Sequence, residues 1–251
     1  MEQVDPIPLE VVRGYLVSTV YQMRATLIRT AYAPVLYETH DFSCGLLNEK
    51  GELAAMSEDF SGHVFAMSLG LAAVLEKFKD DIHPGDVLAV NDPYTGGTHL
   101  NDIAFYTPFF IDGKLMLYIA VRAHHSDVGG STPGSMPLAR EIYEEGLRIP
   151  PVRLYRRGDR DEDLWRLILA NVRTPGERAG DLYAQLAALH TGHARLIELT
   201  ERWSADAVLA AMASLVTYAD RLVAAGVTRI PDGQYGAEDA LEDDGFGSGP
   251  V

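Results

Sequence analysis

The chain of 251 residues is long enough for one large domain or two small ones. Its formal net charge of −15 argues against nucleic acid and an anionic membrane surface as partners, because both bind basic surfaces. Cys44 is the only cysteine, which excludes an intrachain disulfide and a zinc site made of cysteines. A single thiol is compatible with the reducing cytosol, and we expect a cytoplasmic protein. No segment approaches the roughly 20 apolar residues of a membrane helix, so no membrane partner is expected.

The segment before residue 91 alternates between helical and extended patterns. Apolar residues at helical spacing mark helices, and β-forming residues on either side of the turn at Gly51 mark a hairpin. Pro34 cannot continue a helix and ends the first one. We therefore expect a long N-terminal helix over 9–32, hairpin strands over 42–47 and 52–56, a second helix over 65–78 and a short buried strand over 87–90.

The stretch from Asn91 to Pro151 contains the clearest hairpin of the chain. Residues 103–111 and 114–121 are rich in β-forming side chains, and Asp112-Gly113 between them is a strong two-residue turn signal. Pro108 lacks a backbone donor, which indicates an edge strand or a bulge within the first of these strands. We therefore expect an antiparallel or mixed sheet built from hairpins.

Beyond Pro151 the pattern becomes helical. Apolar residues at helical spacing predict further helices, and Ser204 and Gly226 are suited to begin and end the last of them. The expected helices cover 161–172, 180–203 and 205–225. The remaining segment, from Thr228 onward, has strand and turn character. These elements predict an α+β fold with a long N-terminal helix, a sheet made of hairpins and a C-terminal helical segment.

The central hairpin brings potential metal ligands together at its open end. In the simple register Asp102 lies opposite Ala123, and a one-residue bulge would place it opposite His124. His99 lies just before the first strand. Either register makes His99, Asp102 and His124 converge. Two imidazoles and a carboxylate that converge in this way are typical of a divalent metal site.

A divalent ion takes three or four such ligands, so we expect a further acid at the site. Asp41 and, as second choice, Glu38 lie where an earlier strand begins. Mixed nitrogen and oxygen donors suit Zn²⁺ or Mn²⁺ better than Ca²⁺, which prefers oxygen alone. An incomplete protein shell would leave a position for water or substrate, as in catalytic sites. In the alternative interpretation, these strand-end histidines only make hydrogen bonds to the backbone.

Other polar residues of the same stretch are candidates for catalysis or substrate binding. His125 points away from His124, because side chains alternate along a strand, so it is either structural or a proton relay. Asp127 is a second candidate for the relay. Arg148 could hold an anionic substrate group that Glu145 orients, or both could belong to a solvated charged segment. The glycine pairs nearby match no nucleotide-binding motif, so nucleotide binding by this chain is not expected.

Several sequence blocks between Pro8 and the end of the chain follow one another in the order of a known family. They read NDPYTGGTHLND, RAHHSDVGG, PGS, EIYEEGLRIPP, LILANVRTPGERAGDLYAQLAA and DGQYGAEDALEDDG. With these blocks the chain resembles the hydantoinase B family. That family includes N-methylhydantoinase B subunits, the second half of 5-oxoprolinases, caprolactamase β subunits and acetone carboxylase subunits.

The resemblance implies a metal-dependent B-type subunit of an ATP-dependent hydrolase for cyclic amides such as hydantoins, lactams or 5-oxoproline. A separate A-type subunit would bind ATP and phosphorylate the carbonyl, and the B-type subunit would open the ring, so a hetero-oligomer is implied. The family's metal ligands, for zinc or manganese depending on the member, map onto four residues of this chain. They are Asp41, His99, Asp102 and His124. The resemblance therefore favours Asp41 over Glu38.

The same resemblance leaves other functions open. One is a subunit of an ATP-dependent ketone carboxylase, and another is a non-catalytic assembly subunit or an inactive fragment with a structural metal. Family members are much longer than this chain, so the resemblance implies one hydantoinase B-like domain over 1–251 that is an N-terminal portion only. Within it, 1–151 would hold the metal site, 152–230 would be helical and 231–251 would begin a missing C-terminal region.

Overall fold

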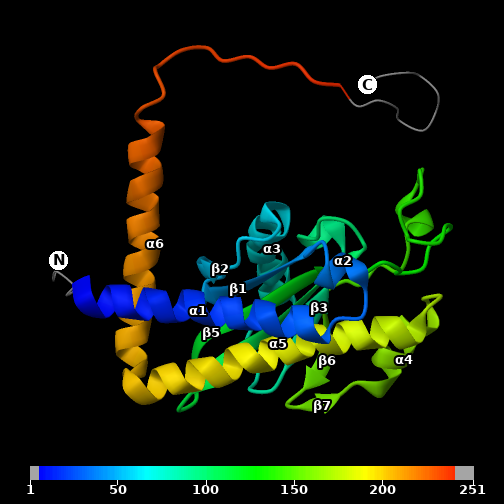
Figure 1. Cartoon of the computed structure of the whole chain (residues 1–251), viewed down its shortest axis with the longest axis horizontal. Helices are drawn as coiled ribbons and strands as arrows, with labels where there is room; N and C mark the ends of the chain where they lie inside the picture. The colour runs from blue at the N-terminus through cyan, green and yellow to red at the C-terminus, as the bar shows by residue number, and fades with distance from the viewer. Residues whose placement is uncertain (1–5, 241–251) are drawn as a thin grey trace.

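The computed structural model describes residues 6–240, and Figure 1 labels its helices and strands. The helices are α1 (Pro6–Thr30), α2 (Pro34–Tyr37), α3 (Ser61–Phe78), α4 (Glu162–Ala170), α5 (Pro175–Arg202) and α6 (Ala205–Val227). The strands are β1 (Phe42–Asn48), β2 (Leu53–Met56), β3 (Val87–Val90), β4 (Asp102–Ile111), β5 (Lys114–His124), β6 (Val152–Arg156) and β7 (Asp159–Arg160). Short 3₁₀ turns lie at Pro93–Thr95 and Ile142–Glu144.

The strands form one seven-stranded sheet with the order β2-β1-β5-β4-β3-β6-β7. Every neighbouring pair is antiparallel, so the sheet is antiparallel rather than mixed. Strands β1–β2, β4–β5 and β6–β7 pair as hairpins, as short connections between antiparallel strands allow. The predicted α+β class is confirmed, and the central β4–β5 hairpin is supported by a strand on either side.

Helices cover both faces of the sheet, and side-chain alternation decides which helix a strand residue meets. On β5, Ile119 and Val121 belong to a core shared with α1 and α5. Tyr118 and Ala120 belong to a second core beneath α3. Figure 1 shows α1 and α5 running side by side across the sheet. From Leu117 to His124, even-numbered residues of β5 therefore face α3, and odd-numbered residues face α1 and α5.

The central hairpin forms with one of the two predicted registers. The register shifts between Phe109 and Phe110, beside Pro108, and this shift places Asp102 opposite His124. Pro108 therefore accompanies a bulge. The edge-strand interpretation is wrong, because β4 is paired on both sides.

The elements before residue 91 lie where their patterns predict them, with different ends. Helix α1 ends at Thr30, two residues before the predicted end. Helix α3 begins at Ser61, a turn earlier than predicted, and this extra turn includes His63. Strand β3 has the predicted bounds.

The part after residue 151 differs from the prediction at both ends. Residues 152–160 are not helical, because they form β6 and β7, and the helical part begins only at Glu162. Pairing of β6 with β3, and of β7 with β6, decides the conformation of this short segment. Residues 228–240 contain no strand, so their predicted strand character is wrong. The expected start of a C-terminal region at 231–251 lies partly outside the described residues, which end at residue 240.

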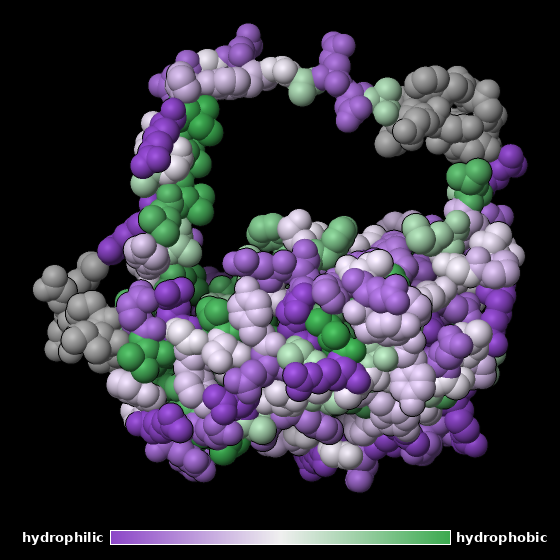
Figure 2. All heavy atoms as spheres, in the orientation of Figure 1, coloured by the Kyte–Doolittle hydropathy of each residue, from purple (hydrophilic) through white to green (hydrophobic). Residues whose placement is uncertain are grey.

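Helix α6 projects from the rest of the molecule (Figure 1). Val208, Met212 and Leu215 in its first half are buried, whereas Leu222 and Val227 in its second half are exposed. Figure 2 shows hydrophobic side chains along this helix. By length and composition alone α6 could cross a membrane, contrary to the expectation from the sequence. Core helices of soluble proteins have the same properties, so these two properties do not indicate a membrane.

The crossing of α1, α5 and β5 depends on the small size of Gly192. A Cβ atom there would lie 2.7 Å from Met23 Sδ and 2.8 Å from Ile119 Cγ2. We expect Gly192→Ala to lower the free energy of unfolding by about 1–3 kcal/mol through overpacking, measured by denaturant unfolding. A Cβ atom at Gly176, in the same helix, would have no other atom within 4 Å. Gly176→Ala should therefore be neutral or stabilising by up to about 1 kcal/mol. Equal losses in both variants would contradict the packing explanation.

Candidate metal centre

The predicted convergence at the mouth of the central hairpin is present. Asp102 begins β4 and His124 ends β5 directly opposite it, while His99 lies in the loop before β4. Asp102 Oδ1 lies 2.9 Å from His99 Nε2 and 3.2 Å from His124 Nδ1, and these two nitrogens are 3.2 Å apart. One donor atom of each residue lies within 4.8 Å of the others, close enough for one ion to be shared. Their role as metal ligands stays a prediction.

Asp41 reaches the same place from another strand. It immediately precedes β1, which pairs with β5, and its carbonyl oxygen accepts a hydrogen bond from the His124 N–H at 3.0 Å. Its carboxylate oxygens lie 3.6 Å from His124 Nδ1 and 3.6 Å from His63 Nε2. Glu38, the other candidate acid, is exposed at the end of α2. The pairing of β1 with β5 is therefore the physical reason to choose Asp41.

His63 belongs to this cluster, although it is absent from the predicted site. It lies in the first turn of α3, is 1% exposed, and places Nε2 at 2.9 Å from Asp102 Oδ2. A signal for it exists in the sequence, because His63 heads the buried stripe that continues through Met67, Leu71 and Val74. An imidazole at a position of apolar periodicity indicates a buried polar contact. The predicted helix begins after His63, so the prediction leaves this residue out of the buried stripe.

The buried Asp102 is the electrostatic centre of the cluster. Burial favours its neutral form, but hydrogen bonds with His124, His63 and His99 outweigh burial and hold the pKa of this carboxyl well below its usual range. The hydrogen bond with Asp102 in turn raises the pKa of His99, against the effect of burial. An ionised carboxylate thus lies among imidazoles in a largely dry environment.

The chemistry of these donors fits a divalent cation. Ring nitrogens and carboxylate oxygens that converge so closely direct lone pairs at one point, which requires protons or a cation between them. Imidazole and carboxylate are the donors of Zn²⁺ and Mn²⁺ sites in proteins. Asp41 and His63 are near enough to complete the set around His99, Asp102 and His124.

A cavity of about 390 Å³ adjoins the exposed edge of the cluster. Thr98, His99 and Glu145 form part of its wall, and its size suits a small molecule. Arg148 is not among the residues that line it. Its Nε lies 3.6 Å from Asp92 Oδ2 instead. Of the two predicted substrate-binding residues, only Glu145 therefore borders this cavity.

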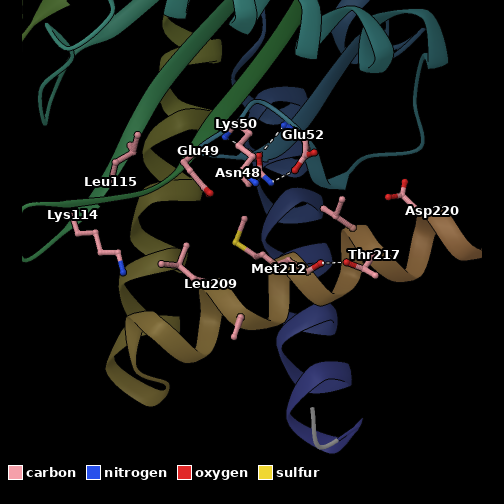
Figure 3. A pocket seen from close by; sticks show the side chains of 13 residues that line it. Asn48, Glu49, Lys50, Glu52, Lys114, Leu115, Leu209, Met212, Thr217 and Asp220 are labelled. Atoms are coloured by element: carbon pink, nitrogen blue, oxygen red, sulfur yellow. Dashed lines mark hydrogen bonds between the residues drawn. The ribbon is translucent and has the colours of Figure 1, made fainter. Parts of the chain in front are cut away.

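A second cavity, of about 650 Å³, lies at the opposite end of the central hairpin (Figure 3). Asn48 and Glu52 from the β1–β2 hairpin, Lys114 from the start of β5 and Met212 from α6 contribute to its wall. The histidine cluster does not line it, because the cluster lies where β5 ends and this cavity lies where β5 begins. The cavity beside the cluster is therefore the better candidate for chemistry, although it is smaller.

The structure does not bring His125 and Asp127 into the cluster. His125 Nε2 makes a 2.9 Å hydrogen bond with Gln185 Oε1 of α5, on the opposite face of the sheet, and burial lowers the pKa of His125 to about 4. Asp127 accepts hydrogen bonds from Gly129 N at 3.0 Å and Thr174 N at 3.3 Å. These contacts favour structural roles for both residues, and the proton relay stays a prediction.

The fold and the cluster together define an α+β protein with nitrogen and oxygen donors at the mouth of a central antiparallel hairpin. A family model described as hydantoinase B/oxoprolinase matches residues 5–250. The chain belongs to the hydantoinase B/oxoprolinase family.

Two relatives are similar in sequence to this chain over nearly all of its length. It is 40% identical to caprolactamase subunit beta of Pseudomonas jessenii over 252 residues, which is 100% of this chain and 43% of that protein. It is 34% identical to 5-oxoprolinase of Saccharomyces cerevisiae over 258 residues, covering 96% of this chain and 20% of that protein. The chain thus spans less than half the length of these relatives.

Two solved structures have a similar fold, one over nearly the whole chain and the other over most of it. The crystal structure of ATP-dependent caprolactamase from Pseudomonas jessenii matches with a TM-score of 0.93 and 39% identity, covering 99% of this chain and 43% of that chain. A nucleotide-free acetone carboxylase matches with a TM-score of 0.77 and 22% identity, covering 84% of this chain and 29% of that chain. The second likeness shows a shared fold alone.

Proposed function

We propose that this chain is the metal-binding part of a B-type subunit that hydrolyses a cyclic amide after a partner A-type subunit activates its carbonyl with ATP. The convergence of His99, Asp102 and His124 beside a small-molecule cavity carries this proposal. Relatives named caprolactamase and 5-oxoprolinase support it, because caprolactam and 5-oxoproline are both cyclic amides.

The cofactor in this proposal is zinc or manganese, held by His99, Asp102, His124 and Asp41. A divalent ion in such a site supplies Lewis-acid polarisation of an oxygen and a lowered pKa for water. The protein contributes an ionised Asp102 whose orientation is steadied by His63, at 2.9 Å from Oδ2. His99, whose side chain is 35% exposed, is the ligand that borders the cavity.

Side chains of the cavity wall hold the substrate in this proposal. The Glu145 carboxylate borders the cavity and can accept a hydrogen bond from the N–H group of a cyclic amide. Hydrolysis of the phosphorylated amide consumes two water molecules. One adds its oxygen to the carbonyl carbon as the C–N bond breaks and the ring nitrogen takes a proton, and the other releases the phosphoryl group as inorganic phosphate. Arg148 is 40% exposed beside Asp92 and would have to leave that carboxylate to hold an anionic group.

ATP is assigned to the A-type partner, because this chain carries no phosphate-binding glycine motif. The partner would phosphorylate the carbonyl oxygen, and the two subunits would form a hetero-oligomer in the cytoplasm. The words "subunit" and "ATP-dependent" in the names of the Pseudomonas jessenii protein and its structure support this arrangement.

The test is to coexpress the protein with an A-type ATP-binding subunit and to supply hydantoin, caprolactam or 5-oxoproline. We expect a ring-opened product that requires both ATP and the partner, detected by mass spectrometry beside ATP turnover. Product that requires a ketone and bicarbonate would instead identify the carboxylase alternative. No product from a fully metal-loaded complex would favour the non-catalytic assembly subunit.

A further inference from the structure

Arg122 is a fully buried cation next to the cluster. It lies on β5, two residues before His124 and on the same face of the sheet. The hydrogen bonds of its guanidinium among residues 6–240 go to neutral oxygens, which belong to Thr98, to two backbone carbonyls and to the Tyr106 hydroxyl. A buried charge without an ionic partner is costly, so a need for packing alone would be met better by an apolar side chain.

The contact with Thr98 controls a hydrogen bond to the central carboxylate. Arg122 Nη1 donates to Thr98 Oγ1 at 3.2 Å, and arginine can only donate. The single hydroxyl proton of Thr98 is therefore directed to its other neighbour, Asp102 Oδ2. His63 Nε2 approaches the same oxygen at 2.9 Å. With Oδ2 occupied in this way, Asp102 Oδ1 faces the two imidazoles across the hairpin mouth.

Arg122 also joins the segments that carry the imidazoles. Its Nη2 donates to the carbonyl of Ala66 at 3.4 Å, one turn after His63 in α3. Nη2 also donates at 3.0 Å to the carbonyl of Gly96, in the loop that leads to His99. Gly96 has a φ of 89°, and a Cβ atom there would collide with the backbone of α3, so the close approach requires glycine. One side chain of β5 thus holds both the helix and the loop.

We propose that Arg122 is a positioning residue of the metal centre, which acts through the Thr98 hydroxyl to present Asp102 Oδ1 as the ligand atom. This inference rests on the proposed metal site. Arg122 has a second role in this inference, which is mechanical. Its guanidinium binds α3 and the loop that carries His99, and so keeps both at fixed distances from the hairpin. Residues that hydrogen-bond to a metal ligand and fix its orientation contribute about 10- to 100-fold to metal affinity.

The test compares Arg122→Met, Arg122→Lys, Thr98→Val and Thr98→Ser in the complete protein. Zn²⁺ dissociation constants are measured by competition with a chromophoric chelator, and backbone hydrogen exchange is measured for residues 61–70 and 93–99. Arg122→Met and Thr98→Val are expected to weaken Zn²⁺ binding by about 10- to 100-fold. Thr98→Ser keeps the hydroxyl and is expected to bind Zn²⁺ as tightly as the wild type.

Arg153→Met is the matched control for loss of a buried arginine. Arg153 is 7% exposed and contacts Asp81 Oδ2 at 3.1 Å, beyond the C-terminal end of α3, whereas the cluster lies at its first turn. This variant is expected to lose stability without a change in the Zn²⁺ dissociation constant. Arg122→Lys and Thr98→Val keep the test informative if Arg122→Met does not fold.

The outcomes separate this inference from the metal site itself. Unchanged Zn²⁺ affinity in both Arg122→Met and Thr98→Val would overturn the role of Arg122 and leave the metal centre standing. A wild-type protein that binds neither Zn²⁺ nor Mn²⁺ would overturn the metal centre and, with it, the ligand-presenting role. The role of Arg122 in holding α3 and the loop before His99 is tested separately, by hydrogen exchange. Faster exchange at 93–99 in Arg122→Met than in Arg153→Met supports it, and equal exchange overturns it.

Discussion

Replacing Asp102 with asparagine is expected to remove metal binding and to lower kcat/KM for ring opening by about 100- to 1,000-fold. The substitution keeps the size of the side chain and removes the negative charge around which His63, His99 and His124 gather. A metal contributes several kcal/mol to transition-state stabilisation, and each 1.36 kcal/mol corresponds to about tenfold in rate. Metal content by mass spectrometry and steady-state kinetics with the A-type partner measure the two effects.

Asp86 offers a matched control for the loss of a buried carboxylate. It is fully buried just before β3 begins, where it accepts hydrogen bonds from His83 N at 3.0 Å and Arg157 N at 2.8 Å and lies 3.3 Å from Arg153 Nε. Asp86→Asn is expected to lower stability by about 1–3 kcal/mol while metal content stays at the wild-type level. Full metal content in Asp102→Asn, or equal metal loss in both variants, would contradict Asp102 as a ligand.

Removal of the metal with a chelator is expected to lower Tm by about 5–10 °C and to abolish ring opening reversibly. A ligand present at about 100 times its Kd stabilises a protein by about 2.7 kcal/mol, and each kcal/mol shifts Tm by about 2–4 °C at this chain length. The physical cause is that the ion neutralises carboxylates held close together at Asp41 and Asp102. Thermal unfolding with and without chelator, followed by titration with Zn²⁺ or Mn²⁺, measures the shift and its recovery.

His124→Ala is the control for this second experiment. The variant lacks one of the proposed ligands, so a chelator should leave its Tm unchanged. A chelator-induced shift as large as that of the wild type would mean that the ion binds elsewhere in the protein. Recovery of activity with only one of the two ions would identify the metal.

The sequence alone predicts the central hairpin and, with it, the meeting of His99, Asp102 and His124. A two-residue turn at Asp112-Gly113 sets which residues of its strands face each other, so a few consecutive residues determine a contact between distant positions. The bulged register is one of the two predicted ones, and it is the register that forms. Alternation along β5 likewise predicts that His125 and His124 point to opposite faces.

The contribution of other elements to the site depends on tertiary packing. His63 reaches Asp102 because α3 lies across one face of the sheet. Asp41 reaches His124 because β1 pairs with β5, whereas the residues alone leave Glu38 open as the alternative. Strands β6 and β7 show the same dependence, because they are too short for a clear periodicity. Strand β6 exists through pairing with β3, and β7 through pairing with β6.

Local patterns thus determine the long helices, the β1–β2 and β4–β5 hairpins and the central donor residues, since turn conformation and periodicity depend on neighbours a few positions away. The tertiary structure decides which helix covers each face, and therefore that His125 meets Gln185 while Arg122 meets Thr98 and α3. The physical reason is that helix packing is driven by burial of apolar surface from the whole chain, which no short segment contains.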